Sequence, residues 1–169
     1  MASPGLSPFI EWSDARLIPI LLRVPFASHG TLRAVCRRTN ALLRSSAFRE
    51  ERRESGYAER GVLIAGGEGC DDLTDECWLL VDRRWLPVAW LSQRHAFPCS
   101  AVIENELWVI GGTGGAQFLA TVEIYNPQTD TWRAGPALSE CRTNAVCGVV
   151  GGSLVVAGGY DEDLTSAEA

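Results

Sequence analysis

The chain has 169 residues, 46% of them hydrophobic, and a formal net charge of −6. This composition is typical of a soluble globular protein, and no apolar run reaches the ~20 residues that span a bilayer. Because the N-terminal region also lacks the basic stretch and the small-residue cleavage site of a signal peptide, we expect an intracellular protein, cytoplasmic or nuclear, with no membrane partner.

The two parts of the chain differ in charge. Residues 1–60 hold ten arginines against six acidic residues, whereas residues 61–169 hold five arginines against fifteen acidic residues. Such asymmetry suggests two segments with different partners. The arginines of the first segment alternate with apolar and acidic residues, as on the solvated face of a helix, whereas a nucleic-acid footprint is a one-sided basic patch. We therefore expect no nucleic-acid partner.

Apolar residues at helical spacing predict three short helices within residues 13–55. The first helix is marked by three residues, Leu17, Ile20 and Leu21, and ends before Pro25. Ser28 is the expected N-cap of the second helix, and Ser46 that of the third. Pro19 would disturb the first helix unless it lies in the first turn. Helices this short make a hairpin that is too small to be stable without a partner.

The rest of the chain repeats with a period of about 46 residues. Three glycine pairs end apolar runs and follow each other at intervals of 45 and 47 residues: Gly66-Gly67, Gly111-Gly112 and Gly158-Gly159. Two tryptophans, Trp85 and Trp132, are also 47 residues apart. Self-similarity at a fixed period of this length indicates a repeat architecture.

Each repeat is predicted to contain four short strands. Residues 101–103 and 107–110 form a hairpin across the polar turn 104–106, and residues 121–125 alternate as a third strand. A turn over residues 126–130 leads into the fourth strand. Four strands per repeat correspond to one blade of a β-propeller, and the glycines supply backbone angles or close approach that a Cβ would forbid. The repeated tryptophan suits the space between neighbouring blades.

The segment Val122–Trp132 resembles a kelch repeat. It contains Tyr125, an Asn-Pro turn and Trp132, and it lies between Gly111-Gly112 and Arg142. The first repeat is less complete, with its third strand expected at residues 77–82 and its turn at Arg83-Arg84. The resemblance implies a mainly β fold with kelch repeats over residues 61–169: a first blade at 61–90, a second at 91–137 and a partial third at 138–169, begun at about 142–161.

About two and a half blades do not close a propeller, which needs roughly four to eight. We expect one of three explanations: a fragment of a longer protein, assembly with other copies, or an array that stays open. The abrupt end at residues 164–169 favours truncation. Unpaired strand edges in an open array would invite association.

The order of residues in 13–55 resembles an F-box, a small helical domain. The matching residues are Leu17, Ile20-Leu21, Arg23-Val24-Pro25, Leu32-Arg33, Val35-Cys36-Arg37-Arg38, Leu42-Leu43 and Ser46-Ala47-Phe48. The chain departs from the family where Trp12-Ser13-Asp14 replaces its Leu-Pro opening and where Thr39 replaces a tryptophan. The resemblance implies binding to a Skp1-type adaptor and, through it, a cullin. The adaptor-binding residues would be Leu17, Ile20, Leu21, Val24, Pro25, Leu32, Val35 and Cys36.

An F-box before kelch repeats implies a substrate-recognition subunit of an SCF-type (cullin-RING) E3 ubiquitin ligase, with loops of the blades binding an unknown protein substrate. By this resemblance, Arg94 and Arg142 could face the binding surface. Alternatively, these arginines pair with acids such as Glu140 or Glu104 and hold the blades together. A second function remains open: a kelch scaffold for cytoskeletal or signalling proteins with no ubiquitin role, its helices capping the first blade, or a decayed fragment.

Catalytic, metal and cofactor motifs are not recognisable in the sequence. His95 is expected at the surface, without a partner for nucleophilic catalysis. Six cysteines form no C-x-x-C pair, and with two histidines no zinc spacing arises. Cys70 and Cys77 flank an acidic run, but intracellular thiols are mostly reduced. The segment 111–115 lacks the following Lys-Ser/Thr of a phosphate loop. We therefore predict a protein-binding module, not an enzyme, with no metal or cofactor.

Overall fold

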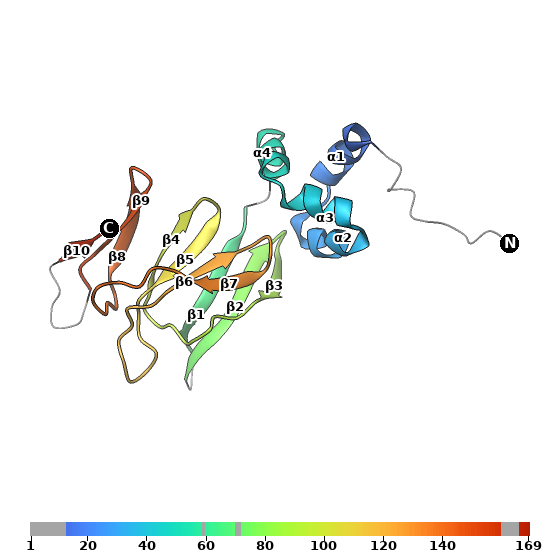
Figure 1. The fold of residues 1–169 in the computed structure, drawn as a ribbon. Coiled ribbons are helices and arrows are strands. Elements are labelled where there is room, and N and C mark those ends of the chain that lie inside the picture. Colours follow the sequence, from blue (N-terminus) through green and yellow to red (C-terminus); the bar gives the residue numbers. More distant parts are fainter. Residues whose placement is uncertain (1–12, 59, 70–71, 160–165) are drawn as a thin grey trace. The chain divides into compact units, whose positions relative to one another are not determined.

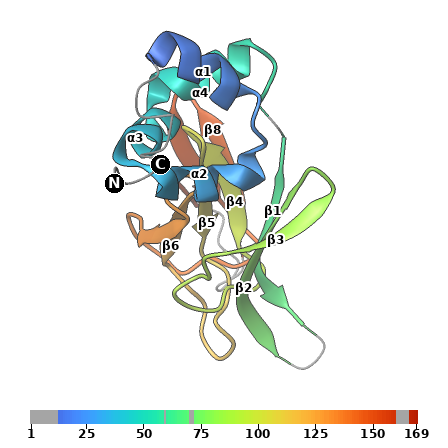
Figure 2. The same ribbon diagram turned by 90° about the vertical axis from the view of Figure 1, so that its right-hand side faces the viewer.

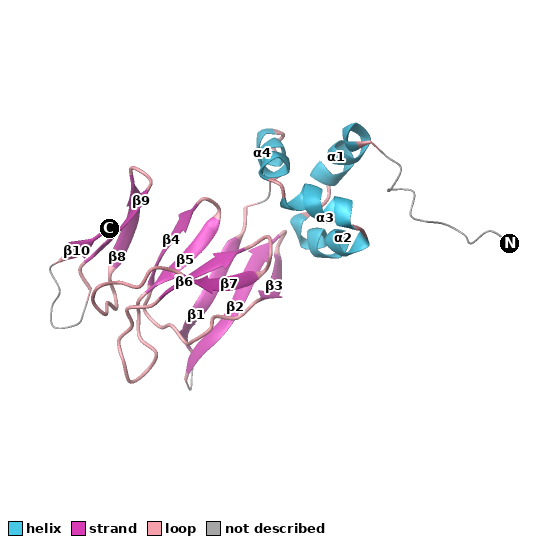
Figure 3. Ribbon diagram, in the orientation of Figure 1, coloured by secondary structure: helices cyan, strands magenta, loops and turns pink. Residues whose placement is uncertain are grey.

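The computed structural model describes residues 13–58, 60–69, 72–159 and 166–169. It is mainly β with a small helical part, as expected (Figure 3). The chain divides into two compact units, one formed by residues 1–62 with 80–86 and the other by residues 63–79 with 87–169. In the part of the chain that is described, no helix is both long and apolar enough to cross a membrane. Cys70 lies outside the described residues.

Within the described residues 13–58, the chain forms four helices and one short 3-10 turn rather than three helices. The elements are α1 (Asp14–Leu22), η2 (Phe26–Ser28), α2 (His29–Val35), α3 (Arg37–Arg44) and α4 (Ser46–Glu54). The expected single second helix is broken at Cys36, whose backbone is extended (φ −159°, ψ 163°). The Thr39 hydroxyl lies 2.9 Å from the carbonyl oxygens of both Leu32 and Cys36, which share its single hydrogen. Thr39 therefore stabilises the corner between α2 and α3.

The predicted helix-end features agree with the structure only in part. Ser45, not Ser46, is the N-cap of α4, and its hydroxyl accepts from the Phe48 N–H at 3.2 Å. Ser28 is the N-cap residue of α2 as predicted, but its side chain makes no capping bond, because the chain already turns in η2. Pro19 lies inside α1 rather than in its first turn, and the helix continues past it to Leu22.

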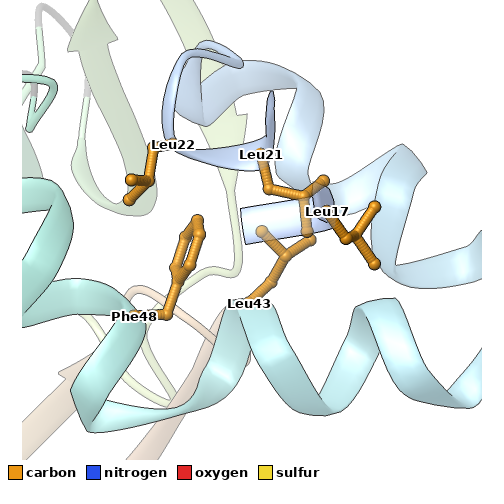
Figure 4. Packing of buried hydrophobic residues seen from close by; sticks show 5 residues of the cluster. All are labelled: Leu17, Leu21, Leu22, Leu43 and Phe48. Carbon is orange, nitrogen blue, oxygen red and sulfur yellow. The ribbon is translucent and has the colours of Figure 1, made fainter. Parts of the chain in front are cut away.

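The core of the helical unit joins three helices (Figure 4). Leu17, Leu21 and Leu22 of α1 point toward Leu43 of α3 and Phe48 of α4, and all five side chains are buried. Full burial of one such side chain stabilises a fold by roughly 1.5–3 kcal/mol. The burial of these five side chains is therefore the main stabilising feature of the helical unit.

Arg52 of α4 is a buried cation at the end of α1. Its guanidinium donates to the carbonyl oxygens of Leu22 and, at 2.8 Å, of Val24. Carbonyls in the last turn of a helix lack intrahelical donors and carry partial negative charge. Arg52 therefore satisfies these groups and ties α4 to the C-terminus of α1.

We expect Arg52→Met to lower the free energy of unfolding of the helical unit by about 2 kcal/mol, because buried carbonyls lose a charged donor while the aliphatic stem is kept. Arg49→Met on the same helix is the control, since Arg49 is exposed, and it should cost less than about 0.5 kcal/mol. Urea unfolding followed by far-UV circular dichroism measures both. Equal losses in the two variants would contradict the capping role.

The described residues form ten strands in three sheets, here called blades 1, 2 and 3 (Figure 1). Blade 1 has the order β1-β2-β3, blade 2 β4-β5-β6-β7 and blade 3 β10-β9-β8. The strands are β1 (Val62–Glu68), β2 (Leu73–Val81), β3 (Arg84–Val88), β4 (Cys99–Ile103), β5 (Glu106–Ile110), β6 (Val122–Asn126), β7 (Thr131–Ala134), β8 (Val146–Val150), β9 (Ser153–Ala157) and β10 (Ala167–Glu168). All pairings in blades 2 and 3 are antiparallel.

The predicted strands of blade 2 lie within about two residues of the observed ones, but blades 1 and 3 differ. In blade 1, β2 begins at Leu73 instead of Cys77, and the turn falls on Asp82-Arg83, both with positive φ. Figure 2 shows the β2–β3 hairpin that this turn connects. Blade 3 was expected to be only begun at about 142–161, but within its predicted bounds of 138–169 it has a third strand, β10, which pairs with β9. In the Asn126 turn of blade 2, Tyr125 donates to Asp130 at 2.9 Å, and its ring centroid lies 5.1 Å from that of Trp132.

Apolar clusters join each blade to the next. Cys77 of blade 1 packs with Leu91 and Val109 of blade 2, and Trp132 covers this cluster. The Trp132 indole N–H donates to the Ala89 carbonyl at 2.7 Å. A second cluster joins blades 2 and 3 through Cys99, Ile110, Val122, Ile124 and Val156. Trp132 thus fills the inter-blade space as expected, whereas Trp85 is exposed.

The paired glycines bring the backbones of neighbouring blades together. All six have positive φ: Gly66, Gly67, Gly111, Gly112, Gly158 and Gly159. A Cβ on Gly111 would lie 2.2 Å from the Arg142 carbonyl oxygen. The Gly112 N–H donates to that same carbonyl at 2.7 Å, and the Gly67 N–H donates to the His95 carbonyl at 2.8 Å. Both suggested reasons for glycine, backbone angle and close approach, therefore apply here.

We expect Gly111→Ala to lower the free energy of unfolding of the blades by more than about 3 kcal/mol, because a strained φ and a backbone clash add together. Gly151→Ala separates these effects, since Gly151 has φ +59° but no atom within 4 Å of its Cβ position. This variant should lose only about 1 kcal/mol. Chemical denaturation of both variants gives the comparison, and similar losses would exclude the clash.

Candidate functional site

Blades 2 and 3 each contain a polar cluster at the same position, between the segment before the first strand and the third strand. Its members correspond across the repeat: Ser92 with Ser139, His95 with Arg142, and Glu123 of β6 with Glu168 of β10. In each blade, the serine N–H donates to the glutamate, at 2.9 Å in blade 2 and 2.7 Å in blade 3. The cluster thus fastens the segment that precedes the first strand of a blade to the third strand.

Arg142 is buried and fully engaged inside blade 3. Its guanidinium donates to Glu168 at 2.9 Å, to Glu140 at 3.1 Å and to the Gly158 carbonyl at 2.7 Å. Further bonds reach the Ser166 carbonyl and hydroxyl. Of the two possibilities for Arg142, pairing with acids is therefore the observed one, including the expected partner Glu140. The pairs lie within one blade, and the side chain is not presented at a surface.

His95 takes the place of this arginine in blade 2. It is completely buried, which corrects the expectation of a surface histidine. Nδ1 lies 2.7 Å from the Gly111 carbonyl oxygen, and Nε2 lies 3.2 Å from Glu123 Oε1. Because a carbonyl oxygen only accepts, Nδ1 carries a hydrogen. The sequence contained a signal for this pairing, the 47-residue spacing from His95 to Arg142.

The side chains of Glu168, Cys77 and Cys99 in the blades have pKa values that differ from their ordinary ones. Burial acts to raise the pKa of Glu168, but the Ser139 N–H and the Arg142 guanidinium outweigh it and hold that pKa below its usual value. Burial raises the pKa of Cys77 to about 11 and that of Cys99 to about 12. These two thiols stay protonated at neutral pH and are poor nucleophiles or metal ligands. Among the described residues, no group of three or more His, Cys, Asp or Glu side chains could hold a metal ion.

Arg94 differs from Arg142 in being exposed. It forms an ion pair with Asp72, next to the start of β2, and the structure does not bring it together with Arg142. The Leu73 N–H and the Arg94 guanidinium hold the pKa of Asp72 below its usual value. Because an exposed ion pair contributes little to stability, both charges are available to a partner.

Two aromatic residues, Phe97 and Phe118, lie on loops of blade 2. Phe97 is exposed, with φ +53°, and Phe118 is also exposed. Their loops pair with each other through Thr113, which bridges Ala96 and Phe118. Exposed aromatic side chains are common anchors in protein interfaces. The loop surface of blade 2, defined here by Arg94, Phe97 and Phe118, is the candidate binding surface of the kelch part, and sequence reasoning had not selected its two phenylalanines.

The predicted adaptor-binding residues are divided between the core and the surface of the helical unit. Leu17 and Leu21 belong to the core. Val24, Leu32 and Cys36 are half-buried, and Cys36 also caps α3. Ile20, Pro25 and Val35 are exposed and remain accessible to another protein.

Comparison with known proteins identifies kelch repeats. Residues 94–139 match the family described as Kelch motif. Kelch repeat and BTB domain-containing protein 12 of Homo sapiens is 40% identical over 74 residues, which cover 36% of this chain and 12% of that protein. F-box/kelch-repeat protein At1g22040 of Arabidopsis thaliana is 26% identical over 89 residues, 49% of this chain and 19% of that protein. The chain thus spans less than a fifth of the length of these two relatives.

The solved structure of YjhT has a similar fold. It superposes with a TM-score of 0.56 at 17% identity and covers 63% of this chain and 38% of that chain. The likeness, with the motif match, supports a partial kelch propeller. The motif match lies within the blades and includes none of residues 13–55, so an F-box is not shown.

We expect the stability of blade 3 to decrease in acid, because a carboxyl with a lowered pKa in the fold contributes stability above its unfolded value and loses it as the pH falls through the folded value. The free energy of unfolding should therefore fall as the pH drops below 4.5, the ordinary value for Glu168. Glu168→Gln should be less stable than wild type at pH 7 and should show a smaller decrease on acidification. Parallel profiles for the two proteins would contradict the assignment.

Proposed function

We propose that this chain is a protein-interaction subunit of an SCF-type E3 ubiquitin ligase, in which the helical unit binds a Skp1-type adaptor and the blades bind a protein substrate. The observation that carries the proposal is the presence, in one chain, of kelch blades preceded by a helical unit with the residue order of an F-box. A relative named as an F-box/kelch-repeat protein supports the combination. In this role the chain performs no chemistry itself, and it acts in the cytoplasm or the nucleus.

The adaptor surface would consist of the exposed apolar side chains of the helical unit. Ile20 on α1 and Val35 at the end of α2 are both more than 40% exposed, and Pro25 lies between these helices in the chain. Leu17 and Leu21 contribute indirectly, because they hold α1 against α3 and α4. Burial of such side chains in an interface is the main source of binding energy at protein contacts.

The substrate surface would be the loop surface of blade 2. Arg94 offers a forked donor for a carboxylate, and Phe97 and Phe118 offer apolar contact area. Arg142 is excluded from direct contact by its buried bonds within blade 3. It acts instead by holding the segment before β8 in place.

A second candidate is a kelch scaffold with no ubiquitin role. Two observations favour it: Leu17 and Leu21 of the implied adaptor set are in the core, and Thr39 stabilises a helix corner where the F-box family has a tryptophan. A relative that carries a BTB domain with its kelch repeats shows that such repeats also occur with a different companion domain.

The test is binding of the purified chain to a Skp1-type adaptor by isothermal titration calorimetry. We expect wild type to bind and Ile20→Asp combined with Val35→Asp to bind at least about tenfold more weakly, because a charge would be buried against an apolar partner.

Ala47→Asp is the matched control, since Ala47 is exposed on α4 and outside the implied adaptor set. It should bind as wild type does, and circular dichroism confirms the fold of each variant. A folded wild type that fails to bind would reject the ligase role and leave the scaffold.

A further inference from the structure

The inter-blade contacts define two kinds of face on a blade. The leading face of a blade packs on the blade before it, and in blade 2 it includes Val109, which packs with Cys77 of blade 1. The trailing face packs on the blade after it, and in blade 2 it includes Cys99, which packs with Val156 of blade 3. Because side chains alternate along a strand, each blade has both faces.

Blade 1 exposes its leading face. Val109 and its counterpart Val156 in blade 3 are each 2% exposed, because a preceding blade covers them. Ile64, at the corresponding position 45 residues before Val109, is 49% exposed. Trp78, which corresponds to Glu123, is exposed as well.

Blade 3 exposes its trailing face. Cys99 is 8% exposed beneath blade 3, whereas Val146, its counterpart 47 residues later, is 69% exposed. Val150 on the same strand is exposed to a similar degree. One chain therefore carries both halves of a contact that it already makes twice internally.

We propose that a second copy of this chain covers these faces, with the leading face of blade 1 in one copy packing on the trailing face of blade 3 in the other. A second copy is the partner we infer because the two junctions inside the chain show that a leading face packs on a trailing face. A second copy supplies a trailing face for blade 1 and a leading face for blade 3. Such a head-to-tail contact uses different patches on the two copies. It extends the stacking by which single repeats bury their cores, and it does not depend on adaptor binding.

The first measurement is analytical ultracentrifugation of the full chain across a wide range of concentration. We expect wild type to associate reversibly. Ile64→Asp on the leading face and Val146→Asp on the trailing face should each weaken association at least about tenfold, because a charge replaces a buried aliphatic group. Both residues are exposed in the single chain, so both variants should fold.

Mixing the two variants gives the sharper result. The Ile64→Asp copy keeps its trailing face and the Val146→Asp copy keeps its leading face, so together they can form one junction and should give a one-to-one heterodimer. A contact between identical faces would show no such rescue.

Val102→Asp is the matched control. Val102 is 68% exposed and lies on β4, on the opposite side of the strand from Cys99, so it belongs to neither outer face. This variant should associate as wild type does. A wild type that stays monomeric at every concentration, or variants that fail to associate on mixing while wild type does, would overturn the proposal.

Discussion

The structure of the blades depends on a close backbone contact between consecutive repeats. The Gly112 N–H of blade 2 donates to the Arg142 carbonyl of blade 3, and the Gly67 N–H of blade 1 donates to the His95 carbonyl of blade 2. The glycine before each donor leaves no room for a Cβ beside that same carbonyl. Main-chain atoms therefore set the distance between neighbouring blades. The apolar cluster at each junction packs within that distance. A side chain at Gly111 would collide with the Arg142 backbone of blade 3 and so disturb the apolar cluster that joins blades 2 and 3.

The residue that accepts this bond also organises its own blade. The His95 and Arg142 side chains extend to a third-strand glutamate, so one residue links two blades through its carbonyl and closes a single blade through its side chain. This double use explains why Arg142 is buried, whereas Arg94 is exposed. The helical unit divides its residues similarly, with Leu17 and Leu21 in the core and Ile20 and Val35 outside.

Local patterns predicted some elements well and others poorly. The strands of blade 2 follow from alternation and from the Asn-Pro turn, where Asn126 accepts from the N–H groups of its near neighbours Gln128 and Thr129. The break at Cys36 was missed, because the residues around it have helical spacing, and the corner is stabilised by the Thr39 hydroxyl bonding back to Leu32. The β10 strand was missed because two residues are too few for a periodic signal.

The sequence by itself determined the repeat, the glycine pairs and the order of helices before blades, because these depend on short-range spacing and backbone angles. Only the tertiary structure decided which repeated residues are buried. Trp85 and Trp132 occupy the same place in their repeats, yet Trp132 packs against blade 1 while Trp85 is exposed. His95 likewise stands beside Arg94 in the chain but is buried, because Glu123 lies opposite it on a strand 28 residues away. Burial depends on the neighbour that stacking supplies, and spacing along the chain does not contain that information.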